Sequence, residues 1–489
     1  MKGTSMHIVF AASECAPFAK TGGLADVVGA LPAELTRLGH RVTVYLPRYR
    51  GVLEHVEEPK VVLPSLTIPF ESYNHFVSVI DGGQRAGVQI YFLDCPELFD
   101  REGLYGTAAG DYPDNAKRFG LFARAVLEAS KQLGVPDVFH VHDWQAALLP
   151  VYLCTTYYFD PVLRKIPCVL TVHNAGYQGW YPPITTEQLL LPWDIFTMDR
   201  LEHFDTFNFL KGGVVYSDAI TTVSRKYAEE IQTPEFGFGL ETIFQRRAAD
   251  LHGILNGVDY AEWNPATDPH IAAHYTPQRL QGKSQCRRDL LHAYALDNVP
   301  ETTPIVGIVS RFATQKGFDL IAEIASKIAS EEMVLLVLGN GEAHYETLFL
   351  KLTEKFPGRI SARVQYDNVL AHKIEAGSDI FLMPSRYEPC GLNQIYSLKY
   401  GTPPVVRATG GLDDTVEEWN PETRAGTGFK FSGNSPLDLL AALRRALAVF
   451  QDKKSWRALM KNGMARNYSW AEPAKEYVAV YEEVTQRRA

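Results

Sequence analysis

The sequence predicts an α/β protein with two doubly wound domains, in which parallel sheets carry helices on both faces. Short apolar, β-branched segments alternate with helical patterns along the whole chain, which is typical of such sheets. The chain has 489 residues, 46% of them hydrophobic, which is too long for one ordinary domain. A segment rich in Asn, Gly, Asp and Pro (254–269) separates two series of apolar segments, and we expect it to be a hinge.

The apolar segments define the expected strands and, through them, the domains. In the first half they are residues 7–13, 41–47, 88–95, 138–142, 168–173 and 218–223. In the second half they are residues 304–311, 333–339, 359–366, 379–385 and 403–409. We expect one domain over 1–253, a second over 270–467, and a C-terminal helix within 468–489 that returns to the first domain. Because ligands bind at the carboxyl ends of strands in such sheets, we expect the active site in a cleft between the domains.

Charge and cysteine content exclude several classes of protein. A net charge of −9 argues against binding to nucleic acid or to an anionic membrane, because a polyanion requires concentrated Lys and Arg. The six cysteines are far apart and form no C-x-x-C pair, so a zinc or disulfide framework is not expected. The longest apolar segments are too short for a membrane span or a signal peptide. We therefore expect a cytoplasmic protein, and the oligomeric state stays open.

Residues 20–26 read K-T-G-G-L-A-D and follow the first expected strand. Two interpretations are open. Gly22 and Gly23 could simply form a tight turn, since glycine reaches backbone angles that other residues avoid. Alternatively, Lys20 and the bare N–H groups of the two glycines could bind a phosphate at the start of a helix.

A histidine-rich segment offers a candidate metal site. His140 and His142 flank one residue of an expected strand, Asp143 follows them, and His173 ends the next strand. These residue types bind metals. We favour ordinary polar packing at strand ends, and we expect no metal. The chain also has no D-x-D pair to hold a metal–diphosphate, so a diphosphate would have to be bound by protein cations.

Three turns that each follow a strand of the second series could bind an anion or a polyol, and the first of them carries such cations. In S-R-F-A-T-Q-K-G (310–317), Arg311 and Lys316 precede an expected helix and could neutralise a diphosphate, or could be a solvated basic pair. In R-Y-E-P-C-G-L (386–392), Glu388 could cap a helix or accept hydrogen bonds from sugar hydroxyls. In the third turn, the N–H groups of Gly410 and Gly411 lie beside a further helix.

Together these motifs resemble those of the bacterial glycogen synthases and plant starch synthases, and the match runs in order along nearly the whole chain. The motifs are K-T-G-G-L-A-D-V-V-G-A-L-P (20–32), H-V-H-D-W (140–144), T-V-H-N (171–174), Y-Q-G (177–179), I-L-N-G-V-D (254–259), S-R-F-A-T-Q-K-G (310–317), E-P-C-G-L (388–392) and T-G-G-L-D-D-T-V (409–416). The resemblance implies the GT-B fold, with two Rossmann-like domains that close over a cleft. It also implies transfer of glucose from ADP-glucose to the non-reducing end of an α-1,4-glucan such as glycogen, with retention of configuration and no cofactor.

The resemblance further assigns roles to residues. Arg311 and Lys316 would hold the diphosphate, and Lys20 with Gly22 and Gly23 would reach the nucleotide-sugar. His173 would lie beside the glucosyl ring, and with Lys20, Arg311, Lys316 and Glu388 it completes the expected catalytic set.

Further positions are expected to bind substrate. Asp143 and Glu388 would hold sugar hydroxyls, Asn256 would contact the donor, and Tyr366 would stack on the adenine. Tyr105, Tyr177 and Trp180 would shape the glucosyl or glucan subsite, or pack as ordinary loop aromatics. The other positions carried over from the motifs are Cys390, Gly391, Leu392, Gly410, Gly411 and Thr415.

Two alternatives to a glucan synthase stay open from the sequence. One is a related retaining transferase with a small acceptor, such as a sucrose- or trehalose-forming synthase. The other is a catalytically silent glucan-binding protein, since a fold does not guarantee a function. A metal-dependent hydrolase built on His140 and His142 ranks behind both of these.

Overall fold

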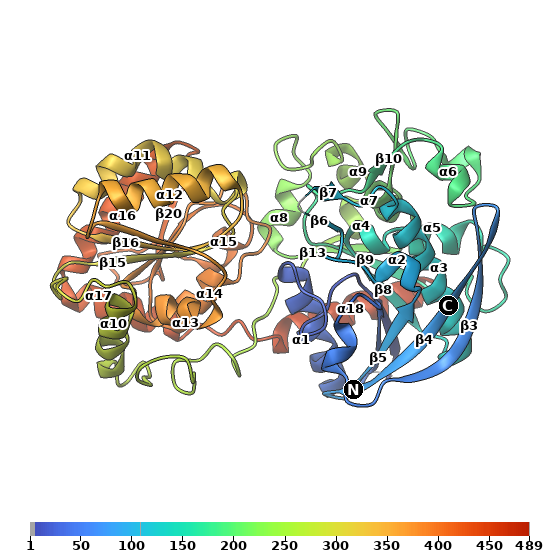
Figure 1. Ribbon diagram of the computed structural model, residues 1–489, viewed down its shortest axis with the longest axis horizontal. Coiled ribbons are helices and arrows are strands. Elements are labelled where there is room, and N and C mark those ends of the chain that lie inside the picture. The colour runs from blue at the N-terminus through green and yellow to red at the C-terminus, as the bar shows by residue number, and fades with distance from the viewer. Residues whose placement is uncertain (1–4, 108, 489) are drawn as a thin grey trace. The chain divides into compact units, whose positions relative to one another are not determined.

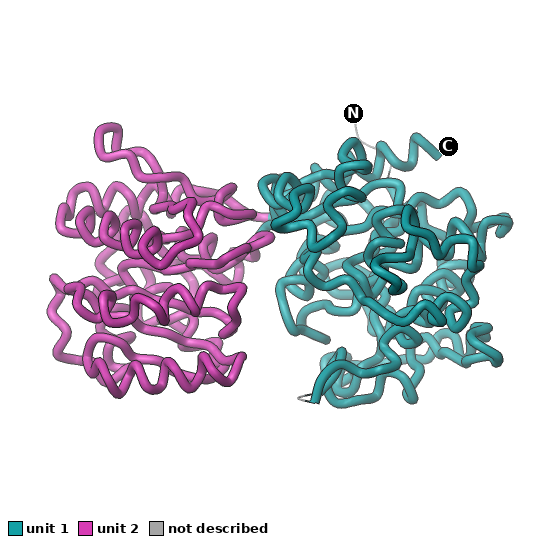
Figure 2. Tube along the Cα trace, turned by 90° about the horizontal axis from the view of Figure 1, so that it is seen from above, with its two compact units in different colours: residues 1–257, 470–489 teal, residues 258–469 magenta. Residues whose placement is uncertain are grey.

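The computed structural model describes residues 5–107 and 109–488 (Figure 1). The chain divides into two compact units, which Figure 2 colours separately. Unit 1 comprises Met1–Gly257 and Trp470–Ala489, and unit 2 comprises Val258–Ser469. Across the described residues, no helix combines the length and the apolar character needed to cross a membrane.

The core of unit 1 is a nine-stranded sheet in which seven consecutive strands run parallel. In spatial order its strands are β14 (Leu251–Gly253), β13 (Ala219–Thr222), β9 (Cys168–Val172), β8 (Val138–His142), β1 (His7–Ala11), β2 (Arg41–Pro47), β5 (Val88–Asp94), β4 (Tyr73–Arg85) and β3 (Lys60–Phe70). Two small sheets lie outside it, β10 (Trp180–Tyr181) with β12 (Thr206–Asn208) and β11 (Glu202–His203), and β6 (Gly106–Thr107) with β7 (Gly110–Asp111). The central strands are buried along their whole length, as expected for a sheet covered on both faces.

The helices of unit 1 connect these strands and cover the sheet (Figure 1). They are α1 (Gly23–Arg37), α2 (Pro96–Phe99), α3 (Asn115–Leu133), α4 (Asp143–Ala146), α5 (Leu148–Cys154), α6 (Thr185–Gln188), α7 (Phe209–Tyr216), α8 (Arg225–Glu230), α9 (Glu241–Arg246) and α18 (Ala471–Arg488).

A long antiparallel hairpin at one edge of the sheet departs from the prediction of parallel strands. β3 and β4 pair with each other and β4 pairs with β5, all antiparallel. The outer strand β3 alternates buried and exposed residues over its second half, because only one of its faces is covered, and α3 packs against it. Such alternation is a weaker sequence signal than the continuous apolar segments of the central strands. The sequence analysis therefore missed this hairpin.

Unit 2 contains a six-stranded, all-parallel sheet. Its spatial order is β17 (Ile360–Val364), β16 (Val334–Gly339), β15 (Ile305–Val309), β18 (Ile380–Met383), β19 (Pro404–Arg407) and β20 (Phe429–Phe431). Alternate residues of a strand face opposite sides, so Leu335 and Val337 join one hydrophobic cluster while Leu336 and Leu338 join another. Each of the eleven predicted strands of the chain contains an observed strand, which confirms the doubly wound class.

Helices cover both faces of this second sheet. They are α10 (Gln281–Ala293), α11 (Phe318–Ser330), α12 (Ala343–Lys355), α13 (Asn368–Gly377), α14 (Asn393–Lys399), α15 (Gly410–Thr415), α16 (Pro436–Gln451) and α17 (Lys453–Met464). Figure 1 shows α11, α12 and α16 on one face and α10 with α13 on the other, in agreement with the two hydrophobic clusters.

The C-terminal helix α18 packs into unit 1, although the chain reaches it from unit 2. Its Tyr481 is fully buried, and the phenol oxygen lies 2.7 Å from Nδ1 of His140 on β8. The other ring nitrogen of His140 lies 2.6 Å from the Thr171 hydroxyl on β9. The helix therefore supplies a hydrogen bond to a buried imidazole in the centre of the sheet.

We expect Tyr481→Phe to lower the free energy of unfolding of unit 1 by about 1–3 kcal/mol, because it leaves Nδ1 of His140 buried and unsatisfied. Urea denaturation followed by far-ultraviolet circular dichroism measures this change. Gln486→Ala, on the exposed side of the same helix, is the matched control and should have little effect. Equal stability of the Tyr481→Phe protein and the parent would contradict the assignment.

Candidate active site

Glu14 organises the K-T-G-G loop of unit 1. This buried carboxylate accepts hydrogen bonds from the Thr21 backbone N–H (2.6 Å), the Thr21 hydroxyl (2.6 Å) and the Gly22 N–H (3.2 Å). The Tyr105 hydroxyl, 91 residues further along the chain, donates a fourth at 2.6 Å. The loop N–H groups do bind an anion, and in this structure that anion is the protein's own Glu14.

The two glycines of the loop face open space. A Cβ atom built at Gly22 or at Gly23 would meet nothing within 4 Å, and Gly22 has an extended φ of −159° that any residue can adopt. Neither packing within the chain nor backbone strain therefore explains a glycine at these positions. The backbone at both positions is open to close approach from outside the chain.

Lys20 lies on the same loop and is half exposed. Its Nζ is 2.6 Å from a carboxylate oxygen of Asp26, in the first turn of α1. Such exposed ion pairs contribute little to stability, so this lysine can exchange Asp26 for another anion at low cost.

A polar cluster lies at the carboxyl ends of β8 and β9. Asp143 accepts the backbone N–H of His173 at 2.7 Å, and Nδ1 of His142 lies 3.0 Å from Nε2 of His173. Asp143 has a left-handed φ of 52°, which is uncommon for a residue with a side chain and typical of functional positions. The structure thus brings together Asp143 and His173, which the sequence placed 30 residues apart.

Burial determines the charge state of this cluster. It lowers the pKa of His173 to about 3, so this imidazole is neutral at physiological pH. It lowers the pKa of His142 and His140 as well. Burial also raises the pKa of Asp143 to about 7, against backbone hydrogen bonds from His173 and Asn174 that favour the ionised form.

His140 is not available as a ligand in the candidate metal site on these histidines. Both ring nitrogens of His140 already have hydrogen-bond partners, Thr171 and Tyr481. His140 is therefore a core residue that joins three elements of unit 1, in line with the polar packing favoured above.

In unit 2, the ion pair of Lys316 and Glu388 joins two neighbouring strand ends. Lys316 lies just beyond β15 and Glu388 just beyond β18, and Nζ is 2.6 Å from Oε2 of the carboxylate. The Ser385 hydroxyl donates a second hydrogen bond to the same oxygen at 3.0 Å. The Glu388 side chain is 7% exposed and the Lys316 side chain 22%, so both are held in a partly desolvated corner.

The glycines of this corner are required by close packing. Gly317 has a left-handed φ of 75°, and a Cβ there would lie 2.1 Å from the carbonyl oxygen of Pro384. A Cβ at Gly410 would lie 2.0 Å from the carbonyl oxygen of Glu388. The absent side chains let the starts of α11 and α15 close on the segment after β18, which fixes the position of Glu388.

The third turn differs from the expected anion site. The Gly411 N–H donates to the carbonyl oxygens of Glu388 and Pro389, both at 3.1 Å, so this donor is already satisfied within the chain. Thr415 likewise donates its hydroxyl to the Gly411 carbonyl at 2.6 Å. The N–H of Gly411 is thus occupied within the chain in this structure, and its role in binding an anion stays a prediction.

The remaining predicted residues fall into two groups. Arg311 and Tyr366 are exposed, Tyr366 at 80%, and can contact a ligand. Cys390 is buried, Leu392 packs in a small hydrophobic cluster with Ile395, and Gly391 sits on a left-handed turn.

Three further predicted residues in unit 1 have different surroundings. Asn256 is buried, and its side-chain oxygen has no hydrogen-bond partner among the described residues, so it is a free acceptor. Tyr177 and Trp180 are about half exposed in the segment after β9, and Trp180 begins β10.

Three residues of the site were missed by the sequence analysis. Glu14 lies within the apolar stretch 8–19, where a lone carboxylate is itself a signal of a buried polar role. Ser385 and Gln394 have no such signal, because their contacts depend on the tertiary structure. The Gln394 amide donates to the carbonyls of Cys390 and Gly391 and so stabilises the turn after Glu388.

Comparisons with known proteins agree with this arrangement. A family model described as the starch synthase catalytic domain matches residues 7–246, and one for glycosyl transferases group 1 matches residues 297–463. A sucrose-phosphate synthase from Thermosynechococcus elongatus, 16% identical over 98% of this chain and 100% of its own, shares the fold with a TM-score of 0.61. The molecule is thus a glycosyltransferase of the GT-B class.

More similar relatives identify the family within this class of glycosyltransferases. The glycogen synthase of Koribacter versatilis is 58% identical over 485 residues, 99% of each chain, and that of Anaeromyxobacter dehalogenans (strain 2CP-C) is 45% identical over 97% of this chain and 99% of its own. The catalytic domain of starch synthase IV from Arabidopsis thaliana, solved with ADP and acarbose, is 31% identical with a TM-score of 0.89, and the match covers 99% of this chain and 100% of that one. The chain belongs to the glycogen synthase family, and it is a hexosyltransferase, which confirms the resemblance stated above.

We expect Glu14→Gln to release the K-T-G-G loop. The NH₂ group of the new amide would face the N–H and O–H groups that now donate hydrogen bonds to the Glu14 carboxylate. Hydrogen exchange of the Thr21 and Gly22 amides, measured by mass spectrometry, should accelerate at least tenfold. The free energy of unfolding should fall by about 2–3 kcal/mol. Glu58→Gln, at an exposed position before β3, is the control. Unchanged exchange at these two amides would refute this role of Glu14.

A second expectation concerns pH and Asp143. Its folded pKa of about 7 lies above the ordinary 3.8, so the unfolded chain loses this proton first as the pH rises. The carboxyl therefore costs stability increasingly between about pH 4 and pH 7, and by a constant amount above pH 7. Asp143→Asn removes this cost.

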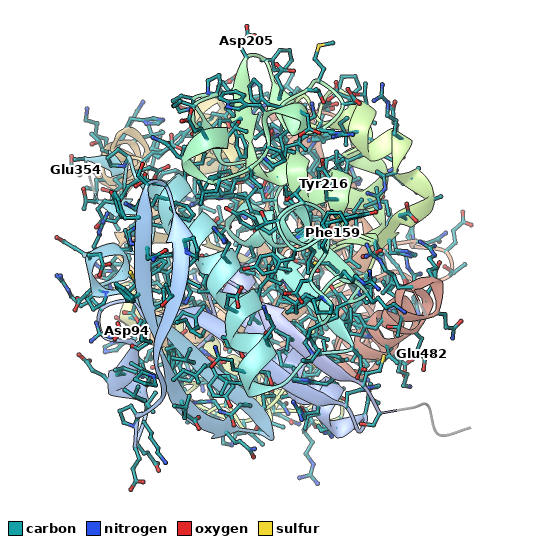
Figure 3. All side chains as sticks on the ribbon, turned by 90° about the vertical axis from the view of Figure 1, so that its right-hand side faces the viewer. Asp94, Phe159, Asp205, Tyr216, Glu354 and Glu482 are labelled. Atoms are coloured by element: carbon teal, nitrogen blue, oxygen red, sulfur yellow. The ribbon has the colours of Figure 1, made fainter. Side chains whose placement is uncertain are left out.

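The stability of Asp143→Asn relative to the parent should rise across that pH window and then level off. Denaturation at pH 4.5, 6 and 8 measures it, and Asp205→Asn on an exposed turn (labelled in Figure 3) is the control for the charge change. A difference between Asp143→Asn and the parent that does not vary with pH would contradict the raised pKa.

Proposed function

We propose that this enzyme transfers glucose from ADP-glucose to the non-reducing end of an α-1,4-glucan, with retention of configuration. The observation that carries the proposal is the Lys316–Glu388 pair at adjacent strand ends. It combines a cation suited to a diphosphate with a carboxylate suited to sugar hydroxyls in one partly desolvated corner.

The donor breaks at the bond between the sugar and the diphosphate, through an oxocarbenium-like transition state. Negative charge then collects on the departing diphosphate, and protein cations stabilise it. We assign this role to Lys316 and to Arg311, which is exposed at the end of β15. The departing phosphate is the proposed base that takes the proton of the attacking glucan hydroxyl on the same face of the sugar.

Unit 1 also offers groups suited to a nucleotide-sugar. The open backbone at Gly22 and Gly23 would admit a phosphate or sugar oxygen, and Lys20 would exchange Asp26 for it. Neutral His173 can donate to or accept from a sugar hydroxyl without placing a second cation beside an oxocarbenium ion. Asp143 and Asn256 supply acceptors for sugar hydroxyls.

Adenine as the donor base is supported by one relative and one residue. The starch synthase IV structure contains ADP, and Tyr366 offers an exposed ring on which a base can stack. We also place the enzyme in the cytoplasm, because its six cysteines are all free thiols, as expected in a reducing compartment.

The donor and acceptor are tested together by release of ADP or UDP from the two glucose donors, each with and without glycogen. Release of ADP that depends on glycogen, with elongated glucan chains as the product, is the expected result. A product of two sugar units would instead establish the small-acceptor alternative. If a folded protein that still binds glycogen releases neither nucleotide, the result would establish the catalytically silent glucan-binding protein.

We expect Lys316→Ala and Arg311→Ala each to lower kcat about 10²- to 10³-fold, as loss of a charge-stabilising group does in other enzymes. Lys327→Ala, exposed in the last turn of α11, should leave kcat unchanged. Circular dichroism shows whether each variant is folded, since Lys316→Ala removes the partner of buried Glu388. Near-normal turnover in both variants would refute the diphosphate assignment.

A further inference from the structure

A second group of chemically reactive side chains lies in unit 1, at the start of α2. His75 is on β4, Cys95 follows the last residue of β5, and Glu97 is in the first turn of α2. The antiparallel register of β4 and β5 ends at the pair of Ser78 and Asp94, close in sequence to His75 on one strand and to Cys95 and Glu97 after the other. Figure 3 labels Asp94, which marks this corner beside the long hairpin. The mechanism proposed above uses none of these residues.

The three side chains have the spacing of a metal site. One ligand atom from each of His75, Cys95 and Glu97 lies within 4.8 Å of the other two. Nδ1 of His75 is 3.8 Å from Oε1 of Glu97. Tetrahedral zinc with bonds of about 2.0–2.3 Å separates its ligand atoms by about 3.3–3.7 Å, so shifts of a few tenths of an ångström to about one ångström would complete the geometry.

The histidine is not explained by hydrogen bonding within the chain. His75 is 8% exposed, and its Nε2 is buried with no hydrogen-bond partner among the described residues. The 3.8 Å between Nδ1 and the carboxylate is too long for a hydrogen bond. A buried imidazole that makes so little use of its nitrogens requires another explanation, and a bound ion is one of the usual ones.

We propose that His75, Cys95 and Glu97 bind a divalent cation of the zinc class, with water as the fourth ligand. The ligand set of one imidazole, one thiolate and one carboxylate suits Zn²⁺ or Co²⁺ and disfavours Mg²⁺ and Ca²⁺, which prefer oxygen ligands. The Glu97 side chain is 59% exposed, which leaves access for the ion and for its water. The thiol proton passes to solvent when the ion binds.

The role of this cation is structural. β4 belongs to the hairpin at the edge of the sheet, where its partner β3 is the outermost strand. An ion shared by β4 and α2 ties that hairpin to the end of β5, a buried strand, and so opposes fraying of the edge. It lies outside the set of residues proposed for glucosyl transfer, and its loss should not abolish turnover.

The test uses the full-length protein, reduced and freed of metal by a chelator, and titrated with Co²⁺. We expect one equivalent to bind, with a thiolate-to-cobalt charge-transfer band and the intense visible bands of a tetrahedral site. Zn²⁺ added afterwards should displace Co²⁺ and abolish the bands, and it should raise the midpoint of thermal unfolding. Mg²⁺ at the same concentration should do neither.

Cys95→Ser should abolish the charge-transfer band, and Glu97→Gln, at an exposed position that tolerates substitution, should weaken Co²⁺ binding at least tenfold. The matched controls are Cys154→Ser on α5 and His292→Ala, an exposed histidine on α10. No charge-transfer band in the reduced parent protein, or an unchanged band in Cys95→Ser, would overturn the proposal. The cation is not required for the glycogen-dependent activity. The outcome of this test is therefore independent of the proposed donor and acceptor.

Discussion

A buried carboxylate needs strong hydrogen-bond donors, and this requirement shapes the candidate site in each unit. In unit 1, Glu14 gathers two backbone N–H groups and two hydroxyls from segments far apart in the sequence. In unit 2, Glu388 takes an ammonium and a hydroxyl from two strand ends. Removing one such donor leaves a charge partly unpaired in a poorly solvated place, which is costly. The loops that carry the chemistry are therefore fixed by charge as much as by apolar packing.

The two kinds of glycine in the site illustrate what a motif can and cannot reveal. Gly317 and Gly410 are glycines because a side chain would collide with a backbone carbonyl of the chain itself. Gly22 and Gly23 meet no such obstacle, and a Cβ atom at either position would face open space. In the sequence all four look alike, since each lies between an expected strand and an expected helix. Whether packing within the chain requires a glycine can be judged only from coordinates.

The sequence predicted those features that depend on local patterns and missed those that depend on tertiary contacts. The parallel strands were predictable because a strand buried on both faces is a continuous apolar segment, as in β15 and β16. The β3–β4 hairpin was missed because one of its faces meets solvent, so that polar residues interrupt the apolar pattern of its strands. At the site, Lys316 and Glu388 were found through motifs, but their contact was not, since 72 residues separate them. Ser385 carried no signal, and Gly411 looked like a free donor until its carbonyl partners were seen.

The Lys316–Glu388 pair also constrains how a donor can be bound. If Lys316 turns to a diphosphate, Glu388 loses its strongest partner and keeps the Ser385 hydroxyl. A carboxylate as buried as this one would then need new donors, and the hydroxyls of a hexose are suitable. A nucleoside diphosphate alone would take the lysine and offer Glu388 nothing in return, whereas a nucleotide-sugar satisfies both members of the pair. On the proposed mechanism, this pair therefore favours the complete donor over its own leaving group, which is the preference that a transferase needs to release one and bind the next.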